Sequence, residues 1–350
     1  MSREQNLFDQ LKPYQERIDT ALRAEFDALP DYRLYGMLRY FMGFADEELR
    51  PTAGYGGKRF RSMLTLVLAD AYNVSENALP LATALELFHN FTLIHDDIED
   101  NDEERRGRPT VWKLWGVPHA INAGDAQLLL VSEVLTRGCA PLGPSGYSLM
   151  EHMLGVCREV AEGQYLDFTL AEMSLGDASV DESIYFDMLT KKTSVLVALA
   201  AEIPGILAEC TKDEQEALWA YGLHLGIAYQ LYDDWMSIWG TRDVTGKQAL
   251  GDLKEKKKTL PVLRAREALT GGDRARLIEL YGCAGALQDA QVQEVKVLLE
   301  SAGVQAAVHT SIADYRTKAR SAVDTLSVSD ENKRMLRAIV DTLVPEPPTV

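Results

Sequence analysis

The chain has 350 residues, 46% hydrophobic and 25% charged, which excludes disordered and fibrous proteins and provides for a sizeable core. Its formal net charge of −17 argues against nucleic acid and anionic lipid as partners, because both are polyanions. The most apolar stretch, 194–210, is interrupted by Glu202 and Pro204, and no secretory signal pattern opens the chain. We expect a cytoplasmic protein without an integral membrane segment.

Apolar residues recur at spacings of three and four along most of the chain, while strict alternation is rare. This periodicity predicts an all-α fold. No shift in composition marks a boundary, so we expect a single large helical domain over 1–343 and an extended, proline-rich tail over 344–350. Thr211 and Glu214 have capping-box spacing and predict the start of a helix that continues to Trp239.

An acidic run, Asp96-Asp97-Ile98-Glu99-Asp100, ends the first predicted helix of interest. At about 100° per residue, His89, Asp96 and Asp100 share one face of this helix. Carboxylates about 5 Å apart repel by about 3 kcal/mol at an effective dielectric of 20, so such a face requires cations when it lies in a cleft. Carboxylate oxygens at this spacing suit Mg²⁺, although a solvated acidic helix end is an equally simple interpretation.

A second acidic pair, Asp233-Asp234, lies further along the predicted helix that ends at Trp239, and Gln230 precedes it by one turn. The neighbouring residues are mainly apolar and aromatic. Because buried charges must be paired or bind metal, we expect this pair to face a cavity.

Three basic clusters stand out in so acidic a chain, at 58–61, 105–108 and 254–258. Each cluster alone is more often a solvated surface. Arg binds phosphate oxygens through two parallel hydrogen bonds and Lys acts as a point charge, so acidic pairs together with basic clusters indicate an anion of the diphosphate type bridged by metal.

These segments resemble the trans-isoprenyl diphosphate synthase (polyprenyl synthetase) family. The matching motifs, in chain order, are GGKRFRS at 56–62, DDIEDNDEERRG at 96–107, GQYLD at 163–167, KT at 192–193, GIAYQLYDD at 226–234 and a lysine-rich loop at 246–261. The resemblance implies a helical bundle around a central cavity, the isoprenoid synthase type I fold, which forms a homodimer. It also implies condensation of isopentenyl diphosphate with an allylic diphosphate after metal-assisted ionisation.

The resemblance also implies a role for each matching residue. Mg²⁺ would be held by Asp96, Asp100 and Asp233, with Asp97 and Asp234 in support. The allylic diphosphate would be neutralised by Arg105, Lys192, Lys247 and Lys257. Isopentenyl diphosphate would be bound by Lys58, Arg61, His89 and Arg106. Thr193 and Gln230 would lie where the allylic cation develops.

The sequence departs from the family pattern at four positions. Ser62 replaces a proline and Ser237 the third aspartate of the second acidic motif, while Leu250 and Lys256 replace small residues. A hydroxyl contributes no charge, so we expect weaker support for the metal at Ser237. We also expect Ser237→Asp to leave activity similar or higher.

Product length depends on the helix before the first acidic motif. Phe91 and Phe88 precede Asp96 by five and eight residues, so they lie about 7.5 and about 12 Å deeper along a regular helix. Either ring could close the tunnel for the growing chain, or both are ordinary core residues. The pattern most resembles synthases of geranylgeranyl diphosphate, with farnesyl diphosphate second.

Other functions remain open at this point. A weakly active or non-catalytic partner subunit of a prenyltransferase would usually have lost the first acidic motif, which is intact here. A terpene cyclase binds only one diphosphate and would have no use for the cluster at 58–61. A helical scaffold would leave the ordered charge clusters unexplained.

Overall fold

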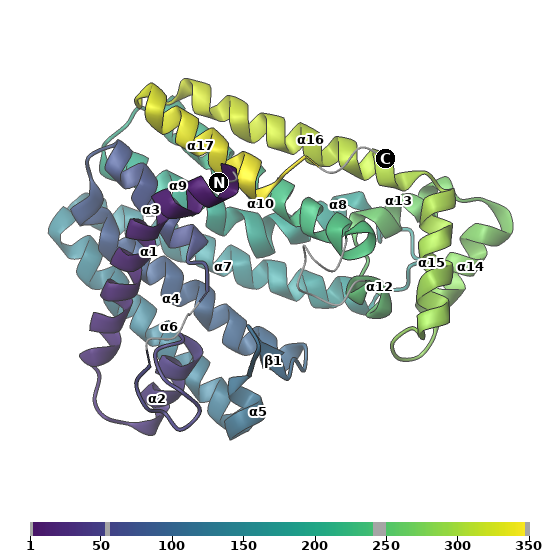
Figure 1. Cartoon of the computed structure of the whole chain (residues 1–350), viewed down its shortest axis with the longest axis horizontal. Helices are drawn as coiled ribbons and strands as arrows, with labels where there is room; N and C mark the ends of the chain where they lie inside the picture. The colour runs from purple at the N-terminus through teal and green to yellow at the C-terminus, as the bar shows by residue number, and fades with distance from the viewer. Residues whose placement is uncertain (1–2, 53–56, 241–249, 347–350) are drawn as a thin grey trace. The chain divides into compact units, whose positions relative to one another are not determined.

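The computed structural model describes residues 3–52, 57–240 and 250–346, and helices account for most of this length (Figure 1). The predicted all-α fold is confirmed. The only named strands in these ranges are β1 (Glu104–Arg105) and β2 (Arg108–Pro109), which pair antiparallel. The chain divides into two compact units, Met1–Leu154 with Ala200–Gln215 (unit 1) and Gly155–Leu199 with Glu216–Val350 (unit 2). The expectation of a single domain stays a prediction.

Unit 1 contains the first acidic motif and the first two basic clusters. Its helices are α1 (Arg3–Asp27), α2 (Arg33–Phe41), α3 (Phe60–Ala71), α4 (Ser75–Glu99), α5 (Val111–Trp115), α6 (Val117–Cys139) and the 3₁₀ turn η1 (Ala140–Leu142). The central helix is α4, which packs against α1, α3 and α6 (Figure 1). Its buried residues are mostly apolar, with Glu86 and Asn90 among them, so burial of this face fixes the helix and thereby the acidic residues at its end.

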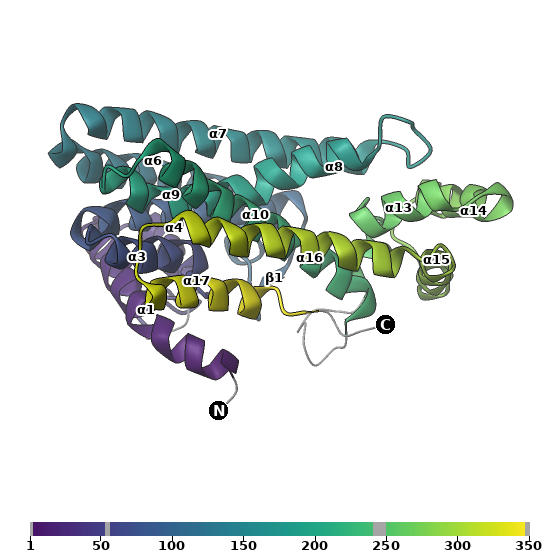
Figure 2. The ribbon, with the colours of Figure 1, turned by 90° about the horizontal axis from the view of Figure 1, so that it is seen from above.

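Unit 2 contains the second acidic motif and the lysine-rich loop. Its elements are α8 (Glu182–Leu189), the π turn η2 (Thr190–Ser194), α12 (Gly251–Lys254), α13 (Leu260–Ala268), α14 (Gly271–Gly282), α15 (Asp289–Ser301), α16 (Val304–Ala322), the 3₁₀ turn η3 (Val323–Thr325) and α17 (Asp330–Leu343). Helices α16 and α17 lie side by side, as both views show (Figures 1 and 2). Three further helices have residues in both units: α7 (Pro144–Glu172), α9 (Val195–Leu207) and α10 (Lys212–Trp239).

Helix α10 begins and ends where the sequence predicts. The backbone N–H of Glu214 donates to Oγ1 of Thr211 at 3.4 Å, which is one half of the expected capping box. The Glu214 carboxylate instead accepts a hydrogen bond from the Tyr72 hydroxyl at 2.6 Å. The cap therefore also ties the start of α10 to α3.

The predicted tail, 344–350, begins directly after the last described helix, and its extended form stays a prediction. Helix α17 ends at Leu343, Val344 is buried, and Glu346 pairs with Arg316 at 2.7 Å. The rest of the predicted tail, 347–350, lies outside the described residues. Within the described ranges, no helix combines the length and apolar character that crossing a bilayer requires.

Candidate active site

The first acidic motif lies at the C-terminal end of α4. Asp96 and Asp97 are in the last turn, Asp100 caps it, and the turn contains no basic residue. The C-terminal end of a helix carries partial negative charge, so carboxylates here are unfavourable unless a cation is near. The sequence thus places negative charge at the negative end of the helix dipole. Such an unfavourable local arrangement is typical of a functional site and would not be expected in a helix selected for stability alone.

Arg105 supplies a cation to this end of α4 from strand β1. Its Nε donates to Oδ1 of Asp97, and its Nη2 lies 3.7 Å from Oδ2 of Asp96. The Asp97 side chain is only 1% exposed, and its Oδ2 has no hydrogen-bond partner. Burial raises the pKa of Asp97 to about 6, although Arg105 opposes the shift. The structure therefore brings together the predicted residues Asp96, Asp97 and Arg105.

Arg106 and Gly107 form the two-residue turn between β1 and β2. Both have positive φ, 56° and 71°, as a type I′ hairpin turn requires. This explains the glycine after two arginines, because a left-handed conformation costs about 1–2 kcal/mol at any residue with a side chain. Sequence analysis found the RRG triplet but missed the hairpin, since two strands of two residues are too short for an alternating pattern.

Arg108 anchors this hairpin to the segment after α2. It donates to the backbone oxygens of Tyr40 at 3.2 Å and Ala45 at 2.8 Å, and its guanidinium stacks 3.9 Å from the Tyr40 ring. The Tyr40 hydroxyl in turn donates to the oxygen of Pro109 at 2.7 Å. Neither Arg108 nor Tyr40 had a predicted role, and both position the arginines at the tip.

The basic cluster at 58–61 points in two directions. Lys58 is exposed, whereas the Arg59 side chain is 0% exposed and lies inside unit 1. Arg59 also has φ of 50° as the N-cap residue of α3. Its inward direction separates it chemically from Lys58 and Arg61, which the sequence assigns to substrate.

His89 and Arg61 contact one another in unit 1. Arg61 Nη1 lies 3.1 Å from His89 Nε2. Burial and the positive charges of Arg61, Arg106, Arg105 and Arg59 hold the pKa of His89 well below its usual value. The ring is therefore neutral at pH 7, so Nε2 accepts a hydrogen bond from Arg61 and orients it. The predicted residues Arg61, His89 and Arg106 all lie in this unit.

In the second acidic motif, the buried carboxylate of Asp234 accepts hydrogen bonds from two neutral donors. The Tyr185 hydroxyl donates to Asp234 Oδ2 at 2.6 Å, and Gln230 Nε2 donates to Oδ1 at 2.9 Å. Burial and the negative charge of Asp252 raise the pKa of Asp234 to about 7. Asp233, one residue earlier, is only partly buried. Tyr185 was missed because nothing in its local sequence marks it.

Lys192 and Thr193 lie on the π turn η2, a wide turn that occurs often at functional sites. Lys192 pairs with Asp167, the last residue of GQYLD. The glycines of two motifs let helices approach this turn. A Cβ on Gly163 would overlap the Lys192 backbone, and one on Gly226 would lie 2.7 Å from Cα of Ser194.

The lysine-rich loop is described in part. Lys257 lies 3.7 Å from Asp252 and 3.2 Å from Glu255. Leu250 and Lys256, which replace small residues of the family pattern, have φ of 71° and 58°. The substitutions therefore fall at left-handed positions that glycine would occupy without strain. Lys247 lies outside the described residues.

Two of the remaining predicted features are local to their helices. Oγ of Ser237 donates to the backbone oxygen of Asp234 at 2.8 Å, so its hydroxyl is bound one turn back along α10. The Phe91 ring packs between Phe88 and His95 on α4, with centroid distances of 5.7 and 5.0 Å. Phe88, Phe91 and His95 thus form a continuous row of ring contacts along α4.

The acidic residues fit magnesium in their donor chemistry. Asp96, Asp100 and Asp233 offer hard oxygen ligands, and the unpartnered Oδ2 of Asp97 is a further acceptor. Within 3–52, 57–240 and 250–346, no three His, Cys, Asp or Glu side chains form a ready cluster for a metal. Mg²⁺ is usually bound by one or two carboxylates together with water and substrate phosphates, so the carboxylates of either motif fit its donor chemistry.

Comparison with known proteins identifies the class to which this fold and these motifs belong. Residues 46–299 match the model of the Polyprenyl synthetase family. A (2E,6E)-farnesyl diphosphate synthase of Mycobacterium tuberculosis is 42% identical over 249 residues, covering 71% of this chain and 67% of that protein. The chain belongs to the polyprenyl synthetase family.

Solved structures agree over almost the whole chain. A crystal structure of a geranylgeranyl pyrophosphate synthase has a TM-score of 0.84 and 32% identity, covering 95% of this chain and 98% of that one. Another, of the Corynebacterium glutamicum geranylgeranyl pyrophosphate synthase complexed with calcium and isoprenyl diphosphate, has a TM-score of 0.76 and 26% identity, covering 97% and 96%. This protein is accordingly a prenyltransferase, a synthase of short-chain trans-prenyl diphosphates.

Proposed function

We propose that this protein condenses isopentenyl diphosphate with allylic diphosphates and releases geranylgeranyl diphosphate as its main product. The observation that carries the product assignment is the single aromatic ring five residues before Asp96, at Phe91, with no insertion in the acidic run. Phe91 is backed by Phe88, so the growing chain would meet two rings. A relative named as a geranylgeranyl pyrophosphate synthase supports this assignment.

Farnesyl diphosphate is the second candidate product. It is favoured by the 42% identity to a protein named farnesyl diphosphate synthase.

The proposed chemistry follows from the charges of the site. Asp96, Asp100 and Asp233 would hold Mg²⁺, which when bound supplies positive charge to the allylic diphosphate. Arg105, Lys192, Lys247 and Lys257 would bind the same diphosphate and stabilise it more as it departs than in the intact ester; each well-aimed contact supplies about 3 kcal/mol.

The second substrate would be bound by Lys58, Arg61, His89 and Arg106. The neutral His89 can donate a hydrogen bond without adding charge. Thr193 and Gln230 would line the position of the allylic cation, and the apolar walls would exclude water that could trap it. Homodimerisation remains part of the proposal.

The test is an elongation assay. Purified protein is incubated with Mg²⁺, isopentenyl diphosphate and, in separate reactions, dimethylallyl, geranyl or farnesyl diphosphate, and the products are sized. We expect a twenty-carbon product from all three primers. A fifteen-carbon end product would establish the farnesyl alternative, and absence of elongation would indicate a non-catalytic subunit or a cyclase.

Phe91→Ala tests the assignment of the ring. Removal of the side chain opens space along α4, so we expect longer products at a similar rate of first condensation. Val134→Ala on α6 is the control for a lost apolar side chain; Val134 is buried, whereas Phe91 is partly buried. An unchanged product distribution in Phe91→Ala would show that another residue limits the chain.

A further inference from the structure

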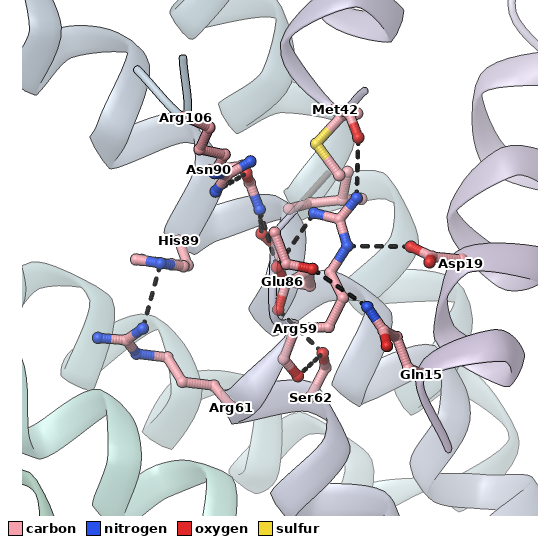
Figure 3. Close-up of polar contacts among 12 residues, drawn as sticks. Gln15, Asp19, Met42, Arg59, Arg61, Ser62, Glu86, His89, Asn90 and Arg106 are labelled. Carbon is pink, nitrogen blue, oxygen red and sulfur yellow. Dashed lines mark hydrogen bonds and ion pairs between the residues drawn. The ribbon is translucent and has the colours of Figure 1, made fainter. Parts of the chain in front are cut away.

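A buried polar cluster beneath the predicted isopentenyl diphosphate residues has Glu86 at its centre (Figure 3). The Glu86 carboxylate accepts from Arg59 Nη1 at 3.3 Å, from Asn90 Nδ2 at 3.0 Å and from Ser62 Oγ at 2.9 Å. Arg59 completes its contacts with Asp19 at 3.0 Å. The charges of Arg59 and Glu86 therefore compensate one another inside unit 1, and neither is presented to a substrate.

The orientation of the Asn90 amide is fixed because its nitrogen donates hydrogen bonds to two acceptors of Glu86. Nδ2 donates to the Glu86 backbone oxygen at 2.8 Å and to its carboxylate. The reverse orientation would place the amide oxygen against two acceptors and leave a buried donor unpaired, which costs about 1–3 kcal/mol. Oδ1 of Asn90 consequently points away from Glu86 and accepts from Arg106 Nη2 at 3.4 Å.

The Asn90 contact orients the side chain of Arg106, which lies at the tip of the hairpin. Its guanidinium lies 5.9 Å from the Phe41 ring, and a Cβ on Gly57 would come within 2.9 Å of its Cζ. Because Gly57 has no Cβ, the Arg106 guanidinium fits beside its backbone. The amide oxygen of Asn90 then fixes the direction in which Nη2 points.

The charge of an arginine's partner within the protein determines how much positive charge the arginine can offer to an anion. Arg59 faces carboxylates, and Arg105 faces Asp97, so their charges are partly neutralised within the protein. Asn90 is neutral, so its contact of 3.4 Å orients Arg106 without itself neutralising the guanidinium.

We propose that Asn90, held in one orientation by Glu86, is a positioning residue that aims Arg106 at the diphosphate of isopentenyl diphosphate. The inference rests on the proposed function and adds a residue that no motif of the sequence assigned. It acts through Arg106 and does not touch the substrate.

Steady-state kinetics with each substrate varied separately tests the proposal. Asn90→Ala removes the contact that orients Nη2 of Arg106, so we expect KM for isopentenyl diphosphate to rise about 10-fold, as loss of a hydrogen bond to a charged group does. We expect kcat and KM for the allylic diphosphate to change by less than about 2-fold. Asn90→Asp keeps the acceptor but adds negative charge beside Arg106 and Glu86, so its KM for isopentenyl diphosphate rises at least as much.

A double-mutant cycle separates positioning from general damage. In an Arg106→Ala background, Asn90→Ala should cause no further rise in KM for isopentenyl diphosphate, because the group it aims is gone. Gln127→Ala is the matched control: Gln127 is another fully buried amide, and it donates to α4 at the Leu87 oxygen at 2.8 Å. It should lower the melting temperature comparably without selective loss of isopentenyl diphosphate.

Three results would overturn the inference while leaving the proposed function intact: equal changes in KM for both substrates, additive effects of Asn90→Ala and Arg106→Ala, or the same selective loss in Gln127→Ala. Failure of the wild-type protein to elongate any primer would instead refute the proposed function, and this inference with it.

Discussion

Each of the two acidic motifs buries one carboxylate, but the partners of these carboxylates differ. Asp97 in α4 is bound by the charged guanidinium of Arg105, which is itself 23% exposed. Asp234 in α10 is bound by the hydroxyl of Tyr185 and the amide of Gln230, both neutral. Asp97 thus has a charged partner, whereas the two described partners of the Asp234 carboxylate are neutral hydrogen-bond donors.

The pKa values of the two carboxyl groups reflect this difference. Both are raised by burial, to about 6 for Asp97 and about 7 for Asp234. Arg105 lowers the first, while Asp252 and Asp233 raise the second further. The comparison teaches that the surroundings of Asp234 favour its neutral form more than those of Asp97, which has a guanidinium as its direct partner; the proposed Mg²⁺ would add positive charge near the second motif.

The largest expected effect is on the pH dependence of stability in the metal-free protein. Because the pKa of Asp234 is raised from 3.8 to about 7, the folded state binds this proton more tightly than the unfolded chain. The free energy of unfolding therefore falls as pH rises through this interval, by about 4 kcal/mol at most. Asp234→Asn removes this decline, so in EDTA at pH 8 the variant should be more stable than wild type.

Urea titrations at several pH values measure this effect, with Asp97→Asn as the comparison. A smaller gain, which grows between pH about 4 and about 6 and stays constant above, is expected there, because the shift is smaller and the variant leaves Arg105 without its carboxylate partner. Equal pH profiles for the two variants would contradict the contrast between the motifs.

Removal of each partner sharpens the same contrast. Arg105→Leu leaves a buried carboxylate beside an apolar side chain, which we expect to cost about 2–3 kcal/mol at pH 8, discounted because Arg105 is partly exposed. Tyr185→Phe removes one neutral hydrogen bond and should cost about 1–2 kcal/mol. Thermal unfolding of both variants at pH 8 checks the order, and a larger loss in Tyr185→Phe would reverse the roles assigned to the two partners.

Helical periodicity and local charge made the first motif largely predictable from sequence. The all-α fold and the end of α10 follow from patterns within about ten residues. The sequence marked Asp96, Asp97 and Arg105 as site residues, although it assigned Arg105 to the diphosphate and did not predict its contact with the two aspartates. A hairpin of two-residue strands was not predictable, because its stability comes from Arg108 and Tyr40, which are distant in sequence.

The second motif shows what local patterns cannot reveal. Tyr185 binds Asp234 across 49 residues, and a lone tyrosine carries no signal of that contact. The π turn at Lys192 and Thr193 likewise arises from close packing against Gly163 and Gly226. Tertiary packing, which no periodicity encodes, produces both features.

Leu250 offers a smaller test near the second motif. Its backbone N–H donates to the Ser237 oxygen at 2.7 Å, and its φ is 71°. Glycine adopts this conformation without a Cβ clash, so Leu250→Gly should stabilise the protein by about 1 kcal/mol, minus the entropy glycine adds to the unfolded chain. Urea unfolding measures the change. Leu253→Gly, at a buried helical position, is the control and should destabilise.

The smallest expected effect concerns Ser237, where the family pattern has an aspartate. The hydroxyl donates to the Asp234 oxygen one turn back, so it neither neutralises nor competes for a cation. Ser237→Asp would add a third carboxylate to this end of α10. In saturating Mg²⁺, its kcat should be similar to that of wild type, within about 3-fold, or higher. The Mg²⁺ concentration at half-maximal rate should fall. Because an extra charge also raises repulsion with Asp233 and Asp234, the metal-free variant should be less stable than wild type. Ser237→Ala is the control for the lost hydroxyl. A large loss of kcat in Ser237→Asp alone would show that the second motif cannot accept further negative charge, because the partners of Asp234 are neutral.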